Sequence, residues 1–68
     1  MEIFERLKYI RKTLNLTQKN FAKEIGMSQS GYSQIETGNK PINDRLIKPI
    51  CLAFNIDENW LRTGEGEM

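Results

Sequence analysis

Four segments of the sequence share one pattern, in which a residue able to cap a helix lies between two apolar residues. One apolar residue directly precedes the cap, and the other follows it by four positions. The side-chain oxygen of such a cap accepts a hydrogen bond from a backbone N–H of the first helical turn, and the apolar side chains pack together across it. The segments are Leu16-Thr17 with Phe21, Met27-Ser28 with Tyr32, Ile42-Asn43 with Ile47, and Ile56-Asp57 with Leu61. Each segment predicts the start of an α-helix.

Another helix precedes the first cap, because apolar residues recur there at helical spacing. Its broad apolar face contains Ile3, Phe4, Leu7, Ile10 and Leu14, with Arg11 on the same side. No capping residue precedes this helix, but Glu2 and Glu5 place negative charge near the positive end of its dipole. The five helices are predicted to end at residues that tolerate a left-handed backbone, namely Asn15, Gly26, Gly38, Asn55 and Gly64.

No segment has the alternating pattern of a β-strand, so the sequence predicts an all-α protein of five helices. A chain of 68 residues holds only one hydrophobic core. Each cap adds about 1 kcal/mol, which matters when the free energy of unfolding is only ~5 kcal/mol. We expect one domain over residues 1–63, followed by a polar tail over 64–68 that frays or begins a linker.

Pro49 conflicts with the helix that Asn43 starts, because proline cannot donate the hydrogen bond to the carbonyl of Arg45. The sequence therefore predicts that residues 44–48 are irregular or bent. Regular helix is expected to resume through Ile50, Cys51 and Phe54.

Composition argues against several classes of protein. The chain has no histidine and a single cysteine, Cys51, and so lacks the commonest general base, a set of zinc ligands and an internal disulfide. It also lacks a glycine-rich phosphate loop and a nucleophile beside a base, so we expect no enzyme activity, no cofactor and no metal. No apolar run approaches the roughly 20 residues that cross a bilayer, and nothing at the N-terminus suggests export. A reduced, cytoplasmic location is expected.

The net charge of +1 hides an asymmetry along the chain. Residues 1–48 have nine Lys and Arg against five Asp and Glu, whereas residues 49–68 have one Arg against four acidic residues. A basic part could meet phosphates while the acidic end faces away, although ordinary solvated helix faces explain the pattern equally well.

Residues 18–37 predict two helices joined by the short turn Gly26-Met27-Ser28. A sharp crossing needs a left-handed backbone at Gly26 and a small side chain at Ala22, where the second helix passes close. The apolar positions of this unit are Phe21, Ile25, Met27, Tyr32 and Ile35. A plain helical hairpin explains each feature separately, but together they favour a DNA-binding helix-turn-helix.

The same residues resemble the helix-turn-helix of phage repressors and Cro-type bacterial regulators, the lambda repressor-like or XRE family. The resemblance is carried by Leu16-Thr17-Gln18, Phe21-Ala22, Ile25 to Ser30, Ile35 to Gly38, and Leu52 to Gly66, and it covers roughly residues 4–66. It implies a compact five-helix bundle that acts as a sequence-specific repressor. Such proteins usually bind a double-stranded DNA operator as a homodimer.

Four polar residues of the second helix of this unit are predicted to read DNA bases, because they lie opposite the core positions. They are Gln29, Ser30, Ser33 and Gln34. Glutamine can form paired hydrogen bonds with adenine, and serine can donate or accept at several base edges. A solvated polar face is the alternative. We further expect that Gly31, having no side chain, lets the helix approach the groove closely.

The resemblance also implies contacts outside the base-reading helix. Gln18 is expected to touch the phosphate backbone and to brace Gln29. Thr37, Asn39 and Lys40 are also expected to contact the DNA backbone. Such contacts position the protein on the DNA and do not read its sequence.

Two further expectations concern the support of this helix. Arg11 and Glu36 occupy positions where phage repressors often hold a partly buried ion pair. The ring of Tyr32 should fill the contact between the two helices while its hydroxyl reaches solvent or a phosphate. Asn20 replaces a glutamate that is frequent in the family, which leaves the cap at Thr17 without a reciprocal partner.

A second class of function remains open. The chain could be a protein-interaction or antitoxin-type regulator whose partner binds elsewhere on the bundle, for example at the acidic C-terminal part. The sequence does not exclude it, and regulators of this type often bind both DNA and a protein.

Overall fold

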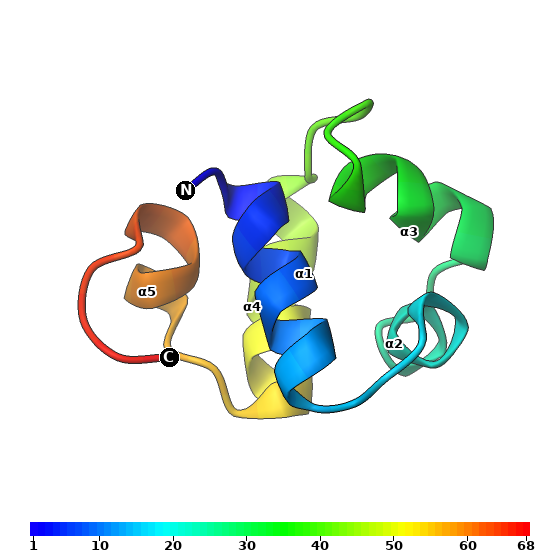
Figure 1. Cartoon of the computed structure of the whole chain (residues 1–68). Coiled ribbons are helices and arrows are strands. Elements are labelled where there is room, and N and C mark those ends of the chain that lie inside the picture. The colour runs from blue at the N-terminus through cyan, green and yellow to red at the C-terminus, as the bar shows by residue number, and fades with distance from the viewer.

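The computed structural model describes all 68 residues, and every regular element in it is an α-helix (Figure 1). The helices are α1 (Ile3–Thr13), α2 (Gln18–Glu24), α3 (Gln29–Glu36), α4 (Asp44–Phe54) and α5 (Glu58–Thr63). The predicted all-α class and the five helices are therefore confirmed.

All four predicted caps lie at the N-terminus of a helix, and each side chain accepts a backbone hydrogen bond. The donors are the N–H of Asn20 to Thr17 Oγ1 (3.0 Å), Gly31 to Ser28 Oγ (3.1 Å), Arg45 to Asn43 Oδ1 (2.9 Å) and Asn59 to Asp57 Oδ1 (2.8 Å). The apolar residue four positions after each cap is buried. At the start of α1 the Glu5 carboxylate accepts a hydrogen bond from the N–H of Glu2 (2.8 Å), which adds to the expected dipole interaction.

The predicted helix ends are also present in the backbone. All five marker residues have a positive φ, which ranges from 55° at Asn55 to 83° at Gly38. Local sequence therefore determines where each helix begins and where it ends.

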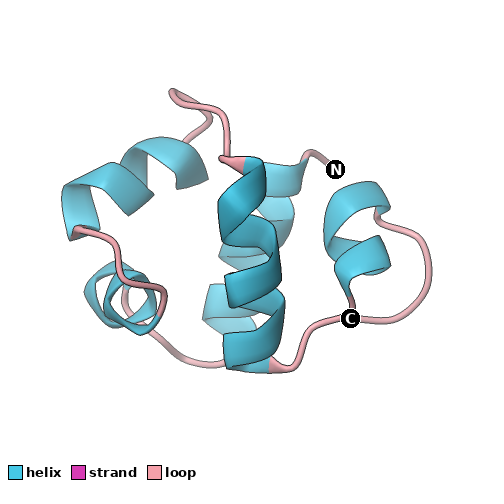
Figure 2. Ribbon diagram, turned by 180° about the vertical axis from the view of Figure 1, so that it is seen from behind, coloured by secondary structure: helices cyan, strands magenta, loops and turns pink.

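The centre of the molecule is occupied by α1 and α4, with α2 and α3 on one side and α5 on the other (Figures 1 and 2). α3 contacts α1 and α2, and α5 contacts α1 and α4. One core of eleven buried apolar residues fills the space between the helices. Phe21 of α2 joins α2 to α3 and α4. Its ring centroid lies 4.8 Å from that of Tyr32 in α3 and, in a stacked arrangement, 4.5 Å from that of Phe54 in α4.

None of the helices has the length and hydropathy of a membrane-spanning segment.

The prediction of an irregular segment before Pro49 is wrong. α4 runs as one helix from Asp44 to Phe54 with the proline inside it. Asn43 caps its first turn, and Ile47 and Ile50, on either side of the proline, are buried in the core. The cap and the burial of these two side chains outweigh the loss of one backbone hydrogen bond.

Arg6 lies inside the fold with only 5% of its surface exposed, and the sequence pattern did not point to it. Its guanidinium donates from Nε to the carbonyl of Leu61 (2.8 Å), from Nη2 to that of Arg62 (3.0 Å), and from Nη1 to that of Met1. The first two carbonyls lie at the C-terminal end of α5, where the helix dipole favours a positive charge. Arg6 therefore joins α1 to the last turn of α5.

The polar tail, residues 64–68, folds back onto the domain. The carbonyl of Met68 accepts a hydrogen bond from the N–H of Asp57 (2.9 Å), and the Met68 side chain packs against the core. These contacts place the tail beside the start of α5.

Candidate nucleic-acid interface

A tight turn joins α2 to α3, as the sequence predicted. Gly26 has a φ of 74°, and a Cβ at this position would meet no atom within 4 Å, so backbone conformation and not lack of space requires the glycine. The N–H of Met27 donates to the carbonyl of Ala22 (2.8 Å) and closes the end of α2. Ala22 itself is fully buried. Its small side chain lets the two helices pack closely.

α3 has an inner face in the core and an outer face in solvent. Tyr32, Ile35 and Glu36 are buried on the inner face. The four residues expected to read bases lie elsewhere on the helix: Gln29, Ser30 and Gln34 are exposed, and Ser33 is partly buried. The structure therefore brings these side chains to the accessible surface of one short helix.

Gly31 has a structural role in the first turn of α3. A Cβ at this position would lie 3.0 Å from Ser28 Oγ and 3.7 Å from Met27 Cε. The same Ser28 oxygen caps α3 by accepting the hydrogen bond from the N–H of Gly31. The absence of a side chain therefore leaves room for the capping hydroxyl, a reason that the sequence alone did not suggest.

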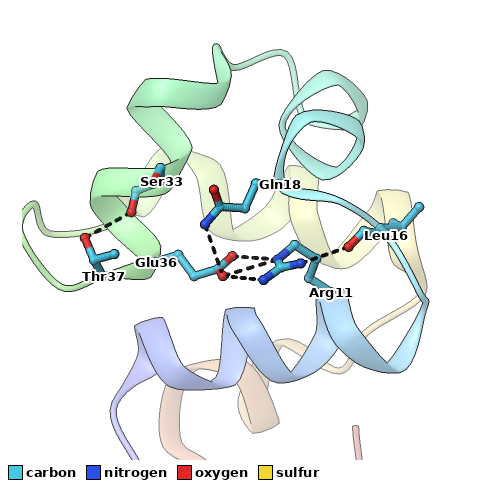
Figure 3. A network of polar contacts seen from close by, with 6 residues as sticks. All are labelled: Arg11, Leu16, Gln18, Ser33, Glu36 and Thr37. Atoms are coloured by element: carbon cyan, nitrogen blue, oxygen red, sulfur yellow. Dashed lines mark hydrogen bonds and ion pairs between the residues drawn. The ribbon is translucent and has the colours of Figure 1, made fainter.

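An ion pair between Arg11 and Glu36 links α1 to the end of α3 (Figure 3). Arg11 Nη2 lies 2.7 Å from Glu36 Oε1, and Arg11 Nε donates to Glu36 Oε2 (2.9 Å). The Arg11 side chain is 14% exposed and that of Glu36 only 2%. Arg11 Nη1 also donates to the carbonyl of Leu16, which ties the loop before α2 to the same network (2.9 Å). The predicted pair is thus present, mostly buried, and bidentate.

Gln18 takes a different partner from the expected one. Its side-chain amide donates to Glu36 Oε1 at 3.4 Å (Figure 3). Glu36 is its hydrogen-bond partner in place of Gln29. Gln18 begins α2 beside the ion pair, so its amide extends the network that holds the end of α3. The expected hydrogen bond between Gln18 and Gln29 is not present in the structure.

The hydroxyl of Tyr32 lies inside the protein, so the expectation that it reaches solvent or a phosphate is wrong. Its oxygen is buried and has no hydrogen-bond partner. Burial raises the pKa of the Tyr32 phenol, and the neighbouring Glu36 carboxylate raises it further. For Glu36, burial favours the neutral acid, but the hydrogen bonds from Arg11 prevail and lower the carboxyl pKa. Glu36 is therefore ionised at neutral pH.

Replacing Tyr32 with Phe should raise the melting temperature. The change removes a buried hydroxyl without a partner, whose desolvation costs roughly 1–3 kcal/mol, and keeps the ring that packs on Phe21. Thermal denaturation followed by circular dichroism measures the effect. Tyr9→Phe is the matched control, because Tyr9 is largely exposed and its hydroxyl needs no such compensation. A lower melting temperature for Tyr32→Phe alone would show that the hydroxyl is hydrogen-bonded in solution.

The loop after α3 is held by hydrogen bonds to backbone carbonyls of α3. The N–H groups of Asn39 and Lys40 both donate to the carbonyl of Gln34 (2.9 and 3.1 Å), and Thr37 Oγ1 donates to the carbonyl of Ser33 (3.0 Å). The side chains of the three residues expected at the DNA backbone, Thr37, Asn39 and Lys40, are all exposed. The loop is thus fixed in place while its side chains stay accessible.

A groove of about 710 Å³ lies where α1 meets the start of α2 and the end of α3. Gln18 and Thr37 line it, together with Lys8 and Lys12 of α1. Neither lysine was among the residues expected to contact DNA, because the pattern that predicts the interface covers only residues 18–40. Their spacing of four residues on the same helix was the available signal.

These elements define a class of protein: a helix-turn-helix DNA-binding domain, in which a short, polar-faced helix is held at the surface of a five-helix bundle. The chain belongs to the helix-turn-helix family HTH_3, which matches residues 7–61, and is of the XRE or Cro/C1 type. The predicted family is confirmed. It is a family of DNA-binding regulators and not of enzymes, and no group of His, Cys, Asp and Glu in the structure is suited to a metal ion.

Among solved structures, the chain is similar to the P22 c2 repressor in complex with a synthetic operator. The TM-score is 0.84 and the identity 25%, over 96% of this chain and 98% of that one. A solution structure of the DNA-binding domain of the same repressor gives a TM-score of 0.80 over 90% of this chain and 80% of that one. The fold and its helix-turn-helix are therefore those of a phage repressor domain.

Curated relatives include regulators of mobile elements and an antitoxin. The chain is 39% identical to the antitoxin PezA of Streptococcus pneumoniae serotype 4 over 79% of the length of this chain. It is 36% identical to the HTH-type transcriptional regulator for conjugative element SXT of Vibrio cholerae over 94% of this chain. It is 42% identical to the cryptic phage CTXphi transcriptional repressor RstR of Vibrio cholerae serotype O1 over 85% of this chain. It spans 34%, 29% and 54% of these three proteins, respectively.

Proposed function

We propose that this chain binds a specific double-stranded DNA operator as a homodimer and acts as a transcriptional repressor in the cytoplasm. The observation that carries this proposal is the division of α3 into a buried face and an accessible polar face. The operator complex of the similar P22 c2 repressor and the repressors among the relatives support it. The single Cys51 is a free thiol, which suits a reducing compartment.

The outer face of α3 supplies the chemistry that base reading needs. Gln29 and Gln34 each offer a donor and an acceptor in one amide, which matches the pair of groups that adenine presents in the major groove. Ser30 and Ser33 each offer a hydroxyl that can donate or accept. We assign these four residues to direct contact with base edges.

Contacts with the DNA backbone would then fall near the C-terminal end of α3. Gln18 lies at the start of α2, and the exposed Thr37, Asn39 and Lys40 follow the end of α3. Such contacts fix the register of the protein on the duplex without reading its sequence. Gln18 lies beside Glu36 at the C-terminal end of α3, so these four residues would hold that end of the helix against the DNA backbone.

The first test is selection of bound duplexes from a random pool. We expect a palindrome whose half-sites are about one helical turn, or roughly 34 Å, apart, because two copies of the chain would each read one half. Recovery of a single unpaired half-site would argue against the homodimer. If no duplex is bound even at low salt, DNA binding itself is wrong and an antitoxin-type interaction module becomes the better description.

The double variant Gln29→Ala, Gln34→Ala should lose most of its preference for the selected duplex over a scrambled one. Each good bidentate base contact is worth about 1–3 kcal/mol of discrimination, so the two together give at least a ~25-fold loss. Competition binding measures the ratio, and an unchanged melting temperature shows that the variant is folded. Gln18→Ala serves as a comparison, because a backbone contact should weaken binding to both duplexes alike. A double variant with the preference of the parent would rule out these residues as readers.

A further inference from the structure

The groove beside the Arg11–Glu36 pair has no role in the readout described above, although three cations of α1 line it. These are Lys8, Arg11 and Lys12. The groove also meets Gln18 at the start of α2 and Thr37 just after α3, two of the residues assigned to the DNA backbone. It is therefore continuous with the proposed DNA interface.

The charge of Arg11 is already compensated within the protein. Its guanidinium holds the Glu36 carboxylate at 2.7 Å and donates to the carbonyl of Leu16. The partner carboxylate is almost fully buried, so water and salt screen this pair only weakly. Arg11 thus adds little net positive charge to the groove.

Lys8 and Lys12 are exposed and form no ion pair. They are four residues apart, so both ammonium groups lie on the same side of α1. Glu5 also lines the groove, where its carboxylate accepts the hydrogen bond from the N–H of Glu2 and offsets part of this charge. The two lysines therefore supply the positive charge of the groove that is not held in an ion pair.

We propose that this groove lies against the DNA backbone and that Lys8 and Lys12 neutralise phosphates there. The inference rests on the proposed function and adds a helix outside the helix-turn-helix to its interface. Lysine is a point charge without the planar geometry of arginine, so it attracts phosphates without regard to sequence. In this arrangement Arg11 supports α3, and the lysines on either side of it bind the DNA.

The test compares Lys8→Gln, Lys12→Gln with the parent on the selected duplex between 50 and 200 mM salt. Each phosphate contact contributes about 0.9 to the slope of log affinity against log salt. Loss of two contacts should make the slope shallower by about 1.8, so the affinity of the parent falls ~12-fold more than that of the variant over this range. The matched control is Lys23→Gln, Lys48→Gln, which makes the same change in charge outside the groove and should keep the steeper slope.

A second readout separates phosphate contact from base reading. The groove variant should bind the selected and the scrambled duplex more weakly by the same factor, so that its preference is unchanged. If the parent binds the duplex and the groove variant has the same salt slope as the parent, the inference is overturned and the proposed function is left intact. Binding to polyglutamate, a mimic of an acidic protein segment, is measured as well. If the groove variant keeps the parent's salt slope on DNA but loses binding to polyglutamate, an acidic protein segment is the ligand and the inference is overturned. A parent that binds no duplex overturns both.

Discussion

Arg6→Met should remove most of the free energy of unfolding of this domain. The change leaves the carbonyls of Leu61 and Arg62 without their donor, and a buried polar group without a partner costs about 1–3 kcal/mol. It also removes the positive charge from the C-terminal end of α5 and the link between α5 and α1. We expect a total loss of about 3–5 kcal/mol, which approaches the whole free energy of unfolding of a small domain.

Urea denaturation followed by Trp60 fluorescence measures this loss, because Trp60 lies in α5 and is buried. The control is Arg45→Met, which replaces an exposed arginine of α4. Arg6→Lys should be intermediate, because one ammonium cannot reproduce the fork of the guanidinium. If Arg6→Met costs no more than Arg45→Met, the guanidinium bonds contribute nothing to stability.

Glu36→Gln should lower the melting temperature at pH 7 by at least about 12 °C. The substitution leaves Arg11 mostly buried without a counter-charge, and breaking a buried pair costs about 3–5 kcal/mol, with each kcal/mol worth roughly 4–8 °C in a domain of this size. Glu24→Gln is the control, because Glu24 is exposed on α2. The double variant Arg11→Met, Glu36→Met should lose less than the two single variants together, because it leaves no unpaired charge.

The same pair gives a dependence on pH with a defined sign. Since the folded protein lowers the pKa of Glu36, the pair contributes fully above the unfolded value of about 4.3, and its contribution is lost as the pH falls through the lower folded value. The difference in melting temperature between the parent and Glu36→Gln should therefore shrink in acid. A constant difference from pH 7 down to pH 2 would contradict this account.

Features determined by neighbouring residues could be predicted from the sequence. The cap at Ser28 and the left-handed ends at Asn15 and Asn55 depend on a few adjacent positions, so a local pattern was enough to find them. The assignment of Gln29 and Gln34 to an accessible face followed from helical periodicity in the same way.

Features determined by distant residues could not be predicted so well. Arg6 donates a hydrogen bond to the carbonyl of Leu61, which lies 55 residues later in the chain. No pattern among neighbouring residues predicts such a contact. The integrity of α4 around Pro49 depends on how firmly Ile47 and Ile50 are held by the core. The hydroxyl of Tyr32 was expected in solvent because periodicity describes the side on which a residue lies, but not how deeply its far end is buried.

The separation of the two faces of α3 has a consequence for how such a domain changes over time. Stability depends on the inner residues and on the Arg11–Glu36 pair, whereas the proposed choice of operator depends on Gln29, Ser30 and Gln34, which lie in solvent. Mutations in this second set cost little folding free energy, because surface substitutions usually change it by less than about 0.5 kcal/mol. A lineage that carries this domain can therefore acquire new target genes by a few amino-acid changes without rebuilding the scaffold.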